Sequence, residues 1–582
     1  MDQSETRLVG AAFLASLVVF GVVGLAANDR EVLVTRDLFV EGPDGVEVAI
    51  SVYEQKLGGG VKPAVLLGHG VMVNKEVFDG LAKELAKAGF LAVALDFRGH
   101  GHSGGYLEGD LVNDFLAAKS YVVDRAAERG DVEEGRLGVV GFSMGGGAAF
   151  ELCARDGDFK AMVGLAPSFR PDLVNATTPS NLLVEVGALE EAFDYRGYLP
   201  AFYNRTGLSG EQFQVGAFYG NFSDGTATRL EVKPGVDHLT VPWDAGVHAD
   251  VVEWMTVALE PQPPYEPASR VTTHLRFAWA SLGLLGGVGL AFVLVKPVAG
   301  ALLGRGRAEG DGQGLEEQQR ETGEAEVPGA ASPPPAAQSA TSRFSARNYL
   351  AYSLAWLVPS VVACAPLFLL PPVLTSFFAT MFVANLVGVW WAFRREKSSF
   401  RRSLAARARA SPRNYLLGLL VGVAVYLPVQ FFFGLHYLSF APGLTRWPYV
   451  PVYFAVLFAS FLADGAFLEA GSGGKAGDVE AGPGVTKDAG GSALKLALAK
   501  CAFWSVVILV PCILAGNFFF AIVLILAVPL LLLHGALYWT VTRHGGSGGH
   551  AAASLASATF LVLVALSPTP MLNLAGGVSL PF

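Results

Sequence analysis

Charged residues are scarce in this chain of 582 residues. Asp, Glu, Lys and Arg make up 16% of the sequence, 52% of the residues are hydrophobic, and the mean hydropathy is +0.43. Because soluble globular domains carry about 25% charged residues, the composition excludes a wholly soluble enzyme and predicts that part of the chain lies in a bilayer. The formal net charge of −9 argues against nucleic acid as a partner, since nucleic acid selects basic surfaces.

Cysteine is also rare, with four residues: Cys153, Cys364, Cys501 and Cys512. Only Cys153 lies in the less hydrophobic part of the chain, so that part has no second cysteine for an internal disulfide. No Cys-x-x-Cys pair and no Cys/His cluster with metal-ligand spacing occurs. The sequence therefore predicts no bound metal.

The first long run without charge is Leu8 to Ala27, which is about the twenty residues that a membrane span needs. Two interpretations stay open. The small residues Gly24-Leu25-Ala26-Ala27 are typical of a signal-peptidase site, which would make the segment a cleaved signal. The long apolar core favours a retained signal anchor over residues 1–27. Both interpretations deliver the following residues to the outside.

Residues 28–270 alternate short apolar runs with helical patterns. The pattern predicts two buried strands, Ala64 to Leu67 and Phe90 to Leu95, and between them an amphipathic helix over Lys75 to Ala88. This alternation predicts an α/β domain with a doubly wound, mostly parallel sheet covered on both faces. Ligands of such sheets bind at the carboxyl ends of the strands.

A serine stands at one such strand end, in Gly141-Phe142-Ser143-Met144-Gly145. The apolar run Leu137 to Val140 precedes it and the helix-forming run Ala148 to Cys153 follows it. A strand, a sharp turn and a helix hold the serine in a strained conformation, so the residues two before and two after it must be small. The turn also places the amide of Met144 at a helix N-terminus, where it can stabilise a developing oxyanion.

Two further motifs accompany the serine: Gly68-His69-Gly70 after one strand, and Asp96-Phe97-Arg98-Gly99-His100-Gly101-His102-Ser103 after the next. With these three motifs the region resembles the α/β-hydrolase superfamily, close to the serine aminopeptidase and dienelactone-hydrolase-like esterase groups. The resemblance covers less than half of the chain. It implies a serine hydrolase that works through an acyl-enzyme and needs no cofactor.

The superfamily's catalytic residues follow the order serine, acid, histidine along the chain. The resemblance places the acid at Glu190, after the strand Leu182 to Val186, although the superfamily usually has Asp there. Glu191 and Asp194 are rival acids. The base is expected at His238, after the last strand.

The resemblance also implies a second oxyanion donor, the amide of Val71. His69 corresponds to a structural histidine, and His248 is expected to be a packing or surface residue. The aromatic-rich segment 193–228 has two interpretations: it lies over the site and shapes the pocket, or it packs beside the sheet.

The remainder of the chain is mostly hydrophobic. We expect a transmembrane helix over 271–303, a disordered polar linker over 304–345, and a polytopic all-α domain of about seven spans over 346–582 with a polar loop at 471–493. The expected spans within that domain are Tyr349–Leu370, Leu374–Phe393, Tyr415–Leu435, Tyr449–Leu468, Leu494–Leu514, Phe518–Val541 and Ala551–Leu572.

Lysine and arginine set the orientation, because short cytoplasmic loops carry an excess of both. The strongly basic residues 394–413 mark one loop as cytoplasmic. Counting spans from it places the N-terminus in the cytoplasm and the hydrolase-like region outside, in a multi-pass protein of the cell membrane.

Two classes of function remain. The first is a membrane-anchored serine hydrolase whose substrate is a small-molecule, lipid or peptide acyl compound, with ester and amide bonds both open. The second is a transport or sensing protein whose hydrolase-like ectodomain is a binding or scaffold module. Asp464 and His534 stand within or near expected spans as solitary ionisable residues, which favours an anchoring role. A paired acid–base cluster facing a cavity would favour transport.

The expected orientation is testable with protease on intact cells or spheroplasts. Cleavage within Asn28–Ser269 with sparing of Gly304–Ser342 is the predicted pattern, because only the first segment faces outward. The reverse pattern, read by immunoblotting of the fragments, contradicts the orientation.

Overall fold

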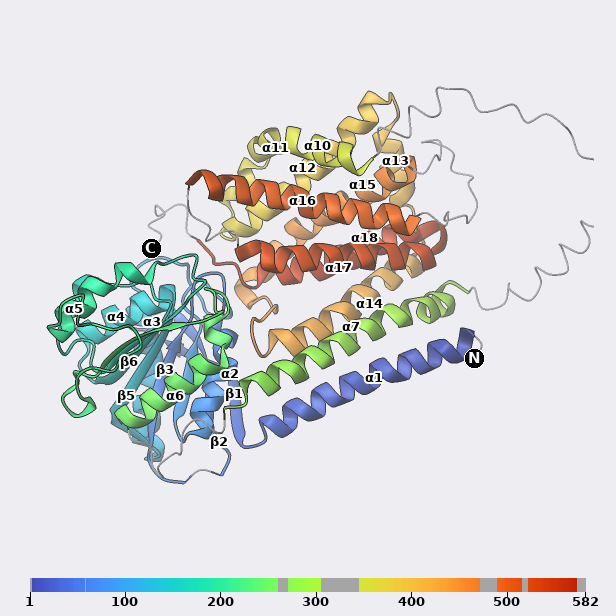
Figure 1. Ribbon diagram of the computed structural model, residues 1–582. Helices are drawn as coiled ribbons and strands as arrows, with labels where there is room; N and C mark the ends of the chain where they lie inside the picture. The colour runs from blue at the N-terminus through green and yellow to red at the C-terminus, as the bar shows by residue number, and fades with distance from the viewer. Residues whose placement is uncertain are drawn as a thin grey trace, which may run out of the picture.

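The computed structural model describes residues 3–57, 59–259, 271–304, 345–471, 489–515 and 522–572. An α/β domain lies at one end of a bundle of long helices, and the helices run away from it (Figure 1). Nearly all of the expected linker and most of the expected polar loop at 471–493 lie outside the described residues. We call the helices of residues 3–28, 273–303 and 346–566 the helix bundle.

The α/β domain contains one eight-stranded sheet with the order β1-β2-β4-β3-β5-β6-β7-β8. β1 and β2 pair antiparallel, as do β2 and β4, and all other neighbours are parallel. This confirms the predicted doubly wound, mostly parallel sheet. The strands are β1 (Val32–Glu41), β2 (Glu47–Gln55), β3 (Lys62–Gly68), β4 (Leu91–Leu95), β5 (Val132–Phe142), β6 (Phe159–Leu165), β7 (Leu182–Gly187) and β8 (Thr228–Lys233).

Helices cover both faces of this sheet, which is why its central strands are apolar without alternation. On β3, Leu66 belongs to the core shared with α3 (Val112–Arg129) and α4 (Met144–Arg155). Its neighbour Leu67 belongs to the core shared with α2 (Asp79–Lys87) and α6 (Ala245–Leu259). Successive side chains point to opposite faces, so one short strand contributes to both cores.

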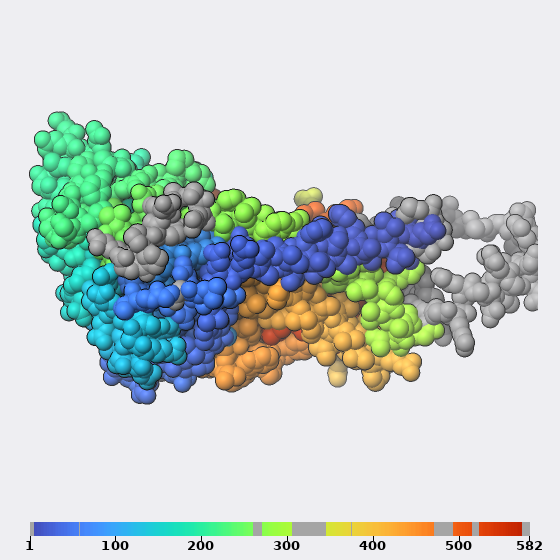
Figure 2. Space-filling view, turned by 90° about the horizontal axis from the view of Figure 1, so that it is seen from below, coloured from blue at the N-terminus to red at the C-terminus, as the bar shows by residue number. Residues whose placement is uncertain are grey.

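Eight helices among the described residues are long and apolar enough to cross a membrane, and they indicate a membrane protein. They are α1 (Gln3–Asn28), α7 (Thr273–Leu303), α12 (Val373–Arg395), α14 (Pro412–Pro428) extended by η7 (Val429–Gly434), α15 (Val450–Gly471), α16 (Ala489–Ala515), α17 (Ile522–His544) and α18 (Gly549–Leu566). α1 lies along α7 on the outside of the bundle (Figure 2). Glycines permit this contact, since a Cβ on Gly21 would lie 2.6 Å from the Cα of Gly283.

The expected span Tyr349–Leu370 is not one helix. It consists of α10 (Ala346–Ala355), α11 (Leu357–Ala363) and the 3-10 helix η6 (Ala365–Leu369). Pro359 and Pro366 explain the breaks, because a proline fits the first turn of a helix but not its interior. The segment still runs along the bundle: the Tyr349 hydroxyl donates to Asp464 of α15, and the carbonyl of Pro371 accepts from the amide of Leu572.

The carboxyl edge of the sheet rests on the helix bundle. Asn74, in the loop after β3, exchanges two hydrogen bonds of 2.9 and 3.0 Å with the backbone of Ser439. The buried Arg446 donates to the carbonyls of Gly99 and Gly101, in the loop after β4, at 2.7 and 2.5 Å. Two segments at this end of the bundle, the loop at 435–446 and the residues after α18, therefore supply hydrogen-bond partners to the loops of the sheet edge, because Met571 also donates to the carbonyl of Gly99.

A buried network of charges ties the same parts together. The Asp79 carboxylate of α2 accepts from Arg36 of β1 and from Lys83, both at 2.6 Å, and from His436 at 3.1 Å. Lys83 also pairs with Asp29, the residue just after α1, which in turn pairs with Arg276 of α7. Burial alone raises the pKa of Asp79, but the cations Lys83 and Arg36 hold it well below its usual range. The carboxylate is thus charged, and the network as a whole joins β1, α2, the residue after α1, α7 and the loop before α15.

Candidate active site

Ser143 stands in a strained backbone conformation between β5 and α4. Its φ is +52° and its ψ is −117°, a region that residues other than glycine rarely occupy. The surroundings fix it: its amide donates to the carbonyl of Leu165 at 3.0 Å, and its carbonyl accepts from Gly146 and Ser168. The turn lifts the side chain off the carboxyl edge of the sheet.

The flanking glycines are required by contact with the backbone. A Cβ on Gly141 would lie 2.4 Å from the carbonyl oxygen of Gly145, and a Cβ on Gly145 would lie 2.2 Å from that of Gly68. Real Cβ atoms do not approach backbone oxygens this closely, so no other residue fits without moving the turn.

Ser143, His238 and Glu190 form a hydrogen-bonded chain. The Ser143 Oγ lies 3.1 Å from His238 Nε2, and His238 Nδ1 lies 2.7 Å from Glu190 Oε1. Ser143 and His238 are each 4% exposed, so little water competes for these bonds. Glu190 Oε1 accepts, so Nδ1 carries the ring hydrogen and Nε2 is free to accept from the serine hydroxyl.

Backbone amides orient the Glu190 carboxylate. Its Oε1 also accepts from the amides of Ala192 and Phe193, at 2.9 and 3.1 Å. The longer side chain of Glu, in place of the superfamily's usual Asp, therefore still reaches the imidazole, because the turn after β7 folds back around the carboxylate.

The two rival acids lie elsewhere. Glu191 accepts from the backbone amide of His238 at 3.2 Å, and burial raises the pKa of its carboxyl. It holds the loop that carries the imidazole, a role that the sequence pattern did not indicate. Asp194 accepts from the amide of Arg196 at the start of a short 3-10 helix and is exposed.

The two expected oxyanion donors both lie beside Ser143 in the chain or in the sheet. Met144 is the first residue of α4, and Val71 follows β3, the strand next to β5. Neither amide has a hydrogen-bond acceptor within the described ranges.

The other histidines of the domain have structural partners. His69 is fully buried, accepts from the amide of Phe97 at 3.0 Å and contacts the carbonyl of Gly70, and burial lowers its pKa to about 4. His248 is also buried, between Thr273 and the carbonyl of Pro242. His102 lies 2.9 Å from Asp37, which raises its pKa.

The aromatic segment 193–228 is divided between its two expected roles. Of the described aromatic residues in this segment, Phe193 alone has a ring contact with His238, and the two ring centroids are 5.6 Å apart. Tyr198 and Phe202 stack instead on Phe169 of the core, and Phe213 packs on Phe202. Most of the segment is a packing unit beside the sheet.

Among the described residues no group of three or more His, Cys, Asp or Glu could hold a metal ion.

Comparison with known proteins identifies related sequences for this domain. Residues 59–193 match the family described as serine aminopeptidase, S33. The chain is 33% identical over 112 residues to a protein of Mycobacterium phage D29 named as a non-heme haloperoxidase, which covers 19% of this chain. It is 30% identical over 118 residues, or 20% of this chain, to the bis(hydroxyethyl) terephthalate hydrolase of Streptomyces coelicolor.

The chain spans 36% of the length of each of these two relatives. Among solved structures, a CIB-like hydrolase from Thermoplasma acidophilum aligns with 38% of this chain and 98% of its own, at 17% identity and a TM-score of 0.29.

The contact at Gly141 predicts a sharp difference between two glycines of the same strand. Gly141→Ala should lower the stability of the purified full-length protein by about 1–3 kcal/mol, because the new methyl group overlaps the turn. Gly135→Ala is the matched control, since a Cβ there meets nothing within 4 Å. Equal melting temperatures for the two variants would contradict the packing described for the turn.

Proposed function

We propose that this chain is a membrane-bound serine hydrolase that cleaves an ester or amide through an acyl-enzyme. The match of residues 59–193 to the serine aminopeptidase family and the mostly parallel eight-stranded sheet support the proposal. The observation that carries the proposal is the hydrogen-bonded chain from Ser143 through His238 to Glu190 at the carboxyl edge of the sheet.

His238 acts as the general base in this proposal. Its Nε2 takes the proton of Ser143 Oγ while the oxygen attacks the acyl carbonyl, and the amides of Val71 and Met144 stabilise the negative oxygen that forms. The imidazolium then gives the proton to the leaving alcohol or amine. Water, deprotonated in the same way, releases the acid and restores the serine.

Glu190 acts through the imidazole. It holds the hydrogen on Nδ1 and stabilises the imidazolium that appears twice in each cycle. Two backbone amides keep its accepting oxygen in place, so the carboxylate does not need to reorganise when the charge develops.

The position of the site supports an amphiphilic acyl substrate, such as a lipid. The loops after β3 and β4 contact the bundle through Asn74 and Gly99. The loop after His238 contacts it through Trp243, whose ring lies 6.0 Å from that of Phe433 and 5.6 Å from that of Tyr437. Ser143 therefore lies at the edge of the sheet that contacts the apolar helices, where a molecule partitioned into a bilayer would arrive.

A cell-membrane location with the hydrolase domain outside completes the proposal. The basic helix α13 (Phe400–Ala408) and the N-terminus lie at the end of the bundle away from the α/β domain (Figure 1). The basic helix and the α/β domain thus lie at opposite ends of the bundle, which supports the orientation proposed from the distribution of arginine and lysine.

Reaction with a fluorophosphonate probe and hydrolysis of p-nitrophenyl acyl esters by the full-length protein test the proposal. Ser143→Ala should abolish labelling, and His238→Ala should lower turnover by about 10³-fold or more. Glu190→Ala should lower it less than either. Ser120→Ala, on α3 with its hydroxyl bonded to its own helix, is the control and should behave as the wild type.

Labelling that survives Ser143→Ala would show that another residue is the nucleophile. A folded wild-type protein that never labels would favour the second class of function, in which the domain is a binding or scaffold module.

A further inference from the structure

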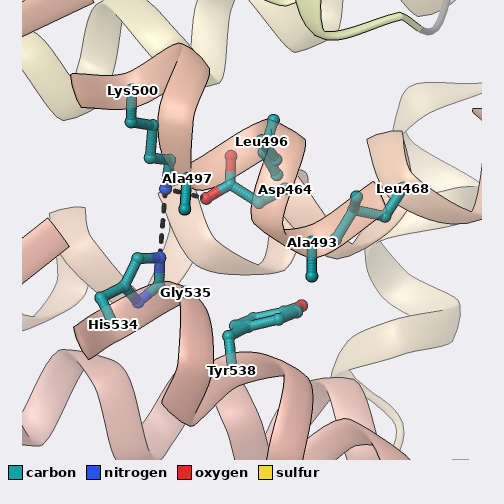
Figure 3. A pocket seen from close by; sticks show the side chains of 9 residues that line it. All are labelled: Asp464, Leu468, Ala493, Leu496, Ala497, Lys500, His534, Gly535 and Tyr538. Carbon is teal, nitrogen blue, oxygen red and sulfur yellow. Dashed lines mark hydrogen bonds and ion pairs between the residues drawn. The ribbon is translucent and has the colours of Figure 1, made fainter. Parts of the chain in front are cut away.

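Three ionisable residues meet inside the helix bundle. The Lys500 ammonium of α16 donates to Asp464 of α15 and lies 3.3 Å from Nε2 of His534 on α17 (Figure 3). Their exposures are 1%, 2% and 4%. Charged groups within membrane helices are costly and are retained where they serve a function. From the sequence, Asp464 and His534 were solitary; the packing of three helices makes them one cluster.

A small cavity adjoins the cluster. Its volume is about 10 Å³ and its lining includes Asp464, Lys500, His534 and Tyr538, which is about the space that one water molecule needs. Because His534 Nε2 accepts from the ammonium, its Nδ1 carries the ring hydrogen. That Nδ1 has no hydrogen-bond partner among the described residues. The small cavity thus has apolar side chains and four polar ones in its lining, and one of the polar groups, the His534 ring, is incompletely satisfied.

A hydrogen-bonded route connects this cavity with the surface. The hydroxyl of Tyr538 is 3.1 Å from Nδ1 of His550 on α18, and Nε2 of His550 is 2.8 Å from Glu469. The Glu469 side chain is 49% exposed and pairs with Arg407 of α13, in the basic region. Each step from the surface to the cavity is thus within hydrogen-bond distance.

Because Gly465 has no side chain, the Tyr538 hydroxyl and the His550 ring can lie against the backbone of α15. A Cβ on Gly465 would lie 2.3 Å from the Tyr538 hydroxyl oxygen and 2.7 Å from His550 Nδ1. Since Gly465 directly follows Asp464, Tyr538 and His550 pack against α15 at the residue next to the buried carboxylate.

Aromatic rings close the other side of the cluster. Phe461, one turn before Asp464 on α15, stacks on the His534 ring at 4.2 Å between centroids. The Lys500 ammonium lies 4.8 Å from the centroid of Phe461 and 5.8 Å from that of Phe382. On α10, Tyr349 donates to Asp464 at 2.8 Å. The polar route therefore leads toward the basic helix α13, and the rings of Phe461 and Phe382 contact the cluster directly.

We propose that the helix bundle takes up a proton at Asp464 from its basic end, through Glu469, His550, Tyr538 and a water in the cavity. In the net step one proton from solvent joins the Asp464 carboxylate to form a neutral carboxylic acid. The relay groups each receive one proton and release one, and return to their starting state. Neutral Asp464 leaves the Lys500 charge without its counterion, so protonation favours a rearrangement of α15 against α16.

This site is a proton-linked element of the membrane helices and is independent of acyl transfer at Ser143. It belongs to the transport or sensing class of function, and it can coexist with hydrolysis in the same chain.

Infrared difference spectroscopy on the full-length protein in liposomes tests the proposal. On acidification the wild type should gain the C=O stretch of a buried carboxylic acid, and Asp464→Asn should lack it. Ser143→Ala should keep the band. Because Asp464→Asn leaves Lys500 unpaired and can prevent folding, the variant Asp464→Asn with Lys500→Met, which removes both charges, is measured as well.

The route is tested by the rate at which the band appears after a pH jump. Gly465→Ala should slow it roughly tenfold or more, because the methyl group displaces the relay from hydrogen-bond distance. Gly300→Ala on α7, where a Cβ meets nothing within 4 Å, is the control. A titrating band that persists without Asp464, or the absence of any such band in the wild type, overturns the site. A wild-type rate in Gly465→Ala overturns the route.

Discussion

The rest of the molecule depends on one contact, the packing of the sheet's carboxyl edge against the helix bundle. A short loop, residues 435–446, supplies both hydrogen-bonding partners of Asn74 and, through Arg446, the donors for two carbonyls after β4. Buried carbonyls and amides need partners, so the edge loops keep their shape only while the bundle is in place. The proposed oxyanion amide of Val71 lies in one of these loops.

The charged network around Asp79 acts in the same place. It joins the residues that follow α1 and begin α7 to the first turn of α2. The two outer helices thus hold the domain by ion pairs, and the loop at 435–446 holds it by hydrogen bonds. Because buried charges that lose one partner are strongly destabilising, the domain and the bundle are expected to fold as interdependent units.

The parts of this structure that follow local rules could be predicted from the sequence. Alternating apolar runs predicted the sheet, and the glycines around Ser143 predicted its strained turn. That Glu190, and not Glu191 or Asp194, contacts the His238 ring depends on how the turn after β7 folds back, which no spacing reveals. Glu191 proved to hold the backbone of His238, a role outside the pattern.

Contacts between distant segments could not be predicted either, because they depend on how the whole chain folds and not on local spacing. Asn74 and Ser439 are 365 residues apart, and neither residue type signals the other. Asp464, Lys500 and His534 lie on three helices, so hydropathy showed isolated polar positions and not a cluster. The break within 349–370 could have been anticipated from Pro359 and Pro366, yet whether a proline kinks a span or divides it depends on the neighbouring helices.

A cryo-electron microscopy structure of the full-length protein after reaction with a fluorophosphonate tests the proposed active site most directly. We expect phosphorus bonded to Ser143 Oγ, with its oxygen within hydrogen-bond distance of the amides of Val71 and Met144. An adduct on another residue, or an oxygen turned away from both amides, would contradict it.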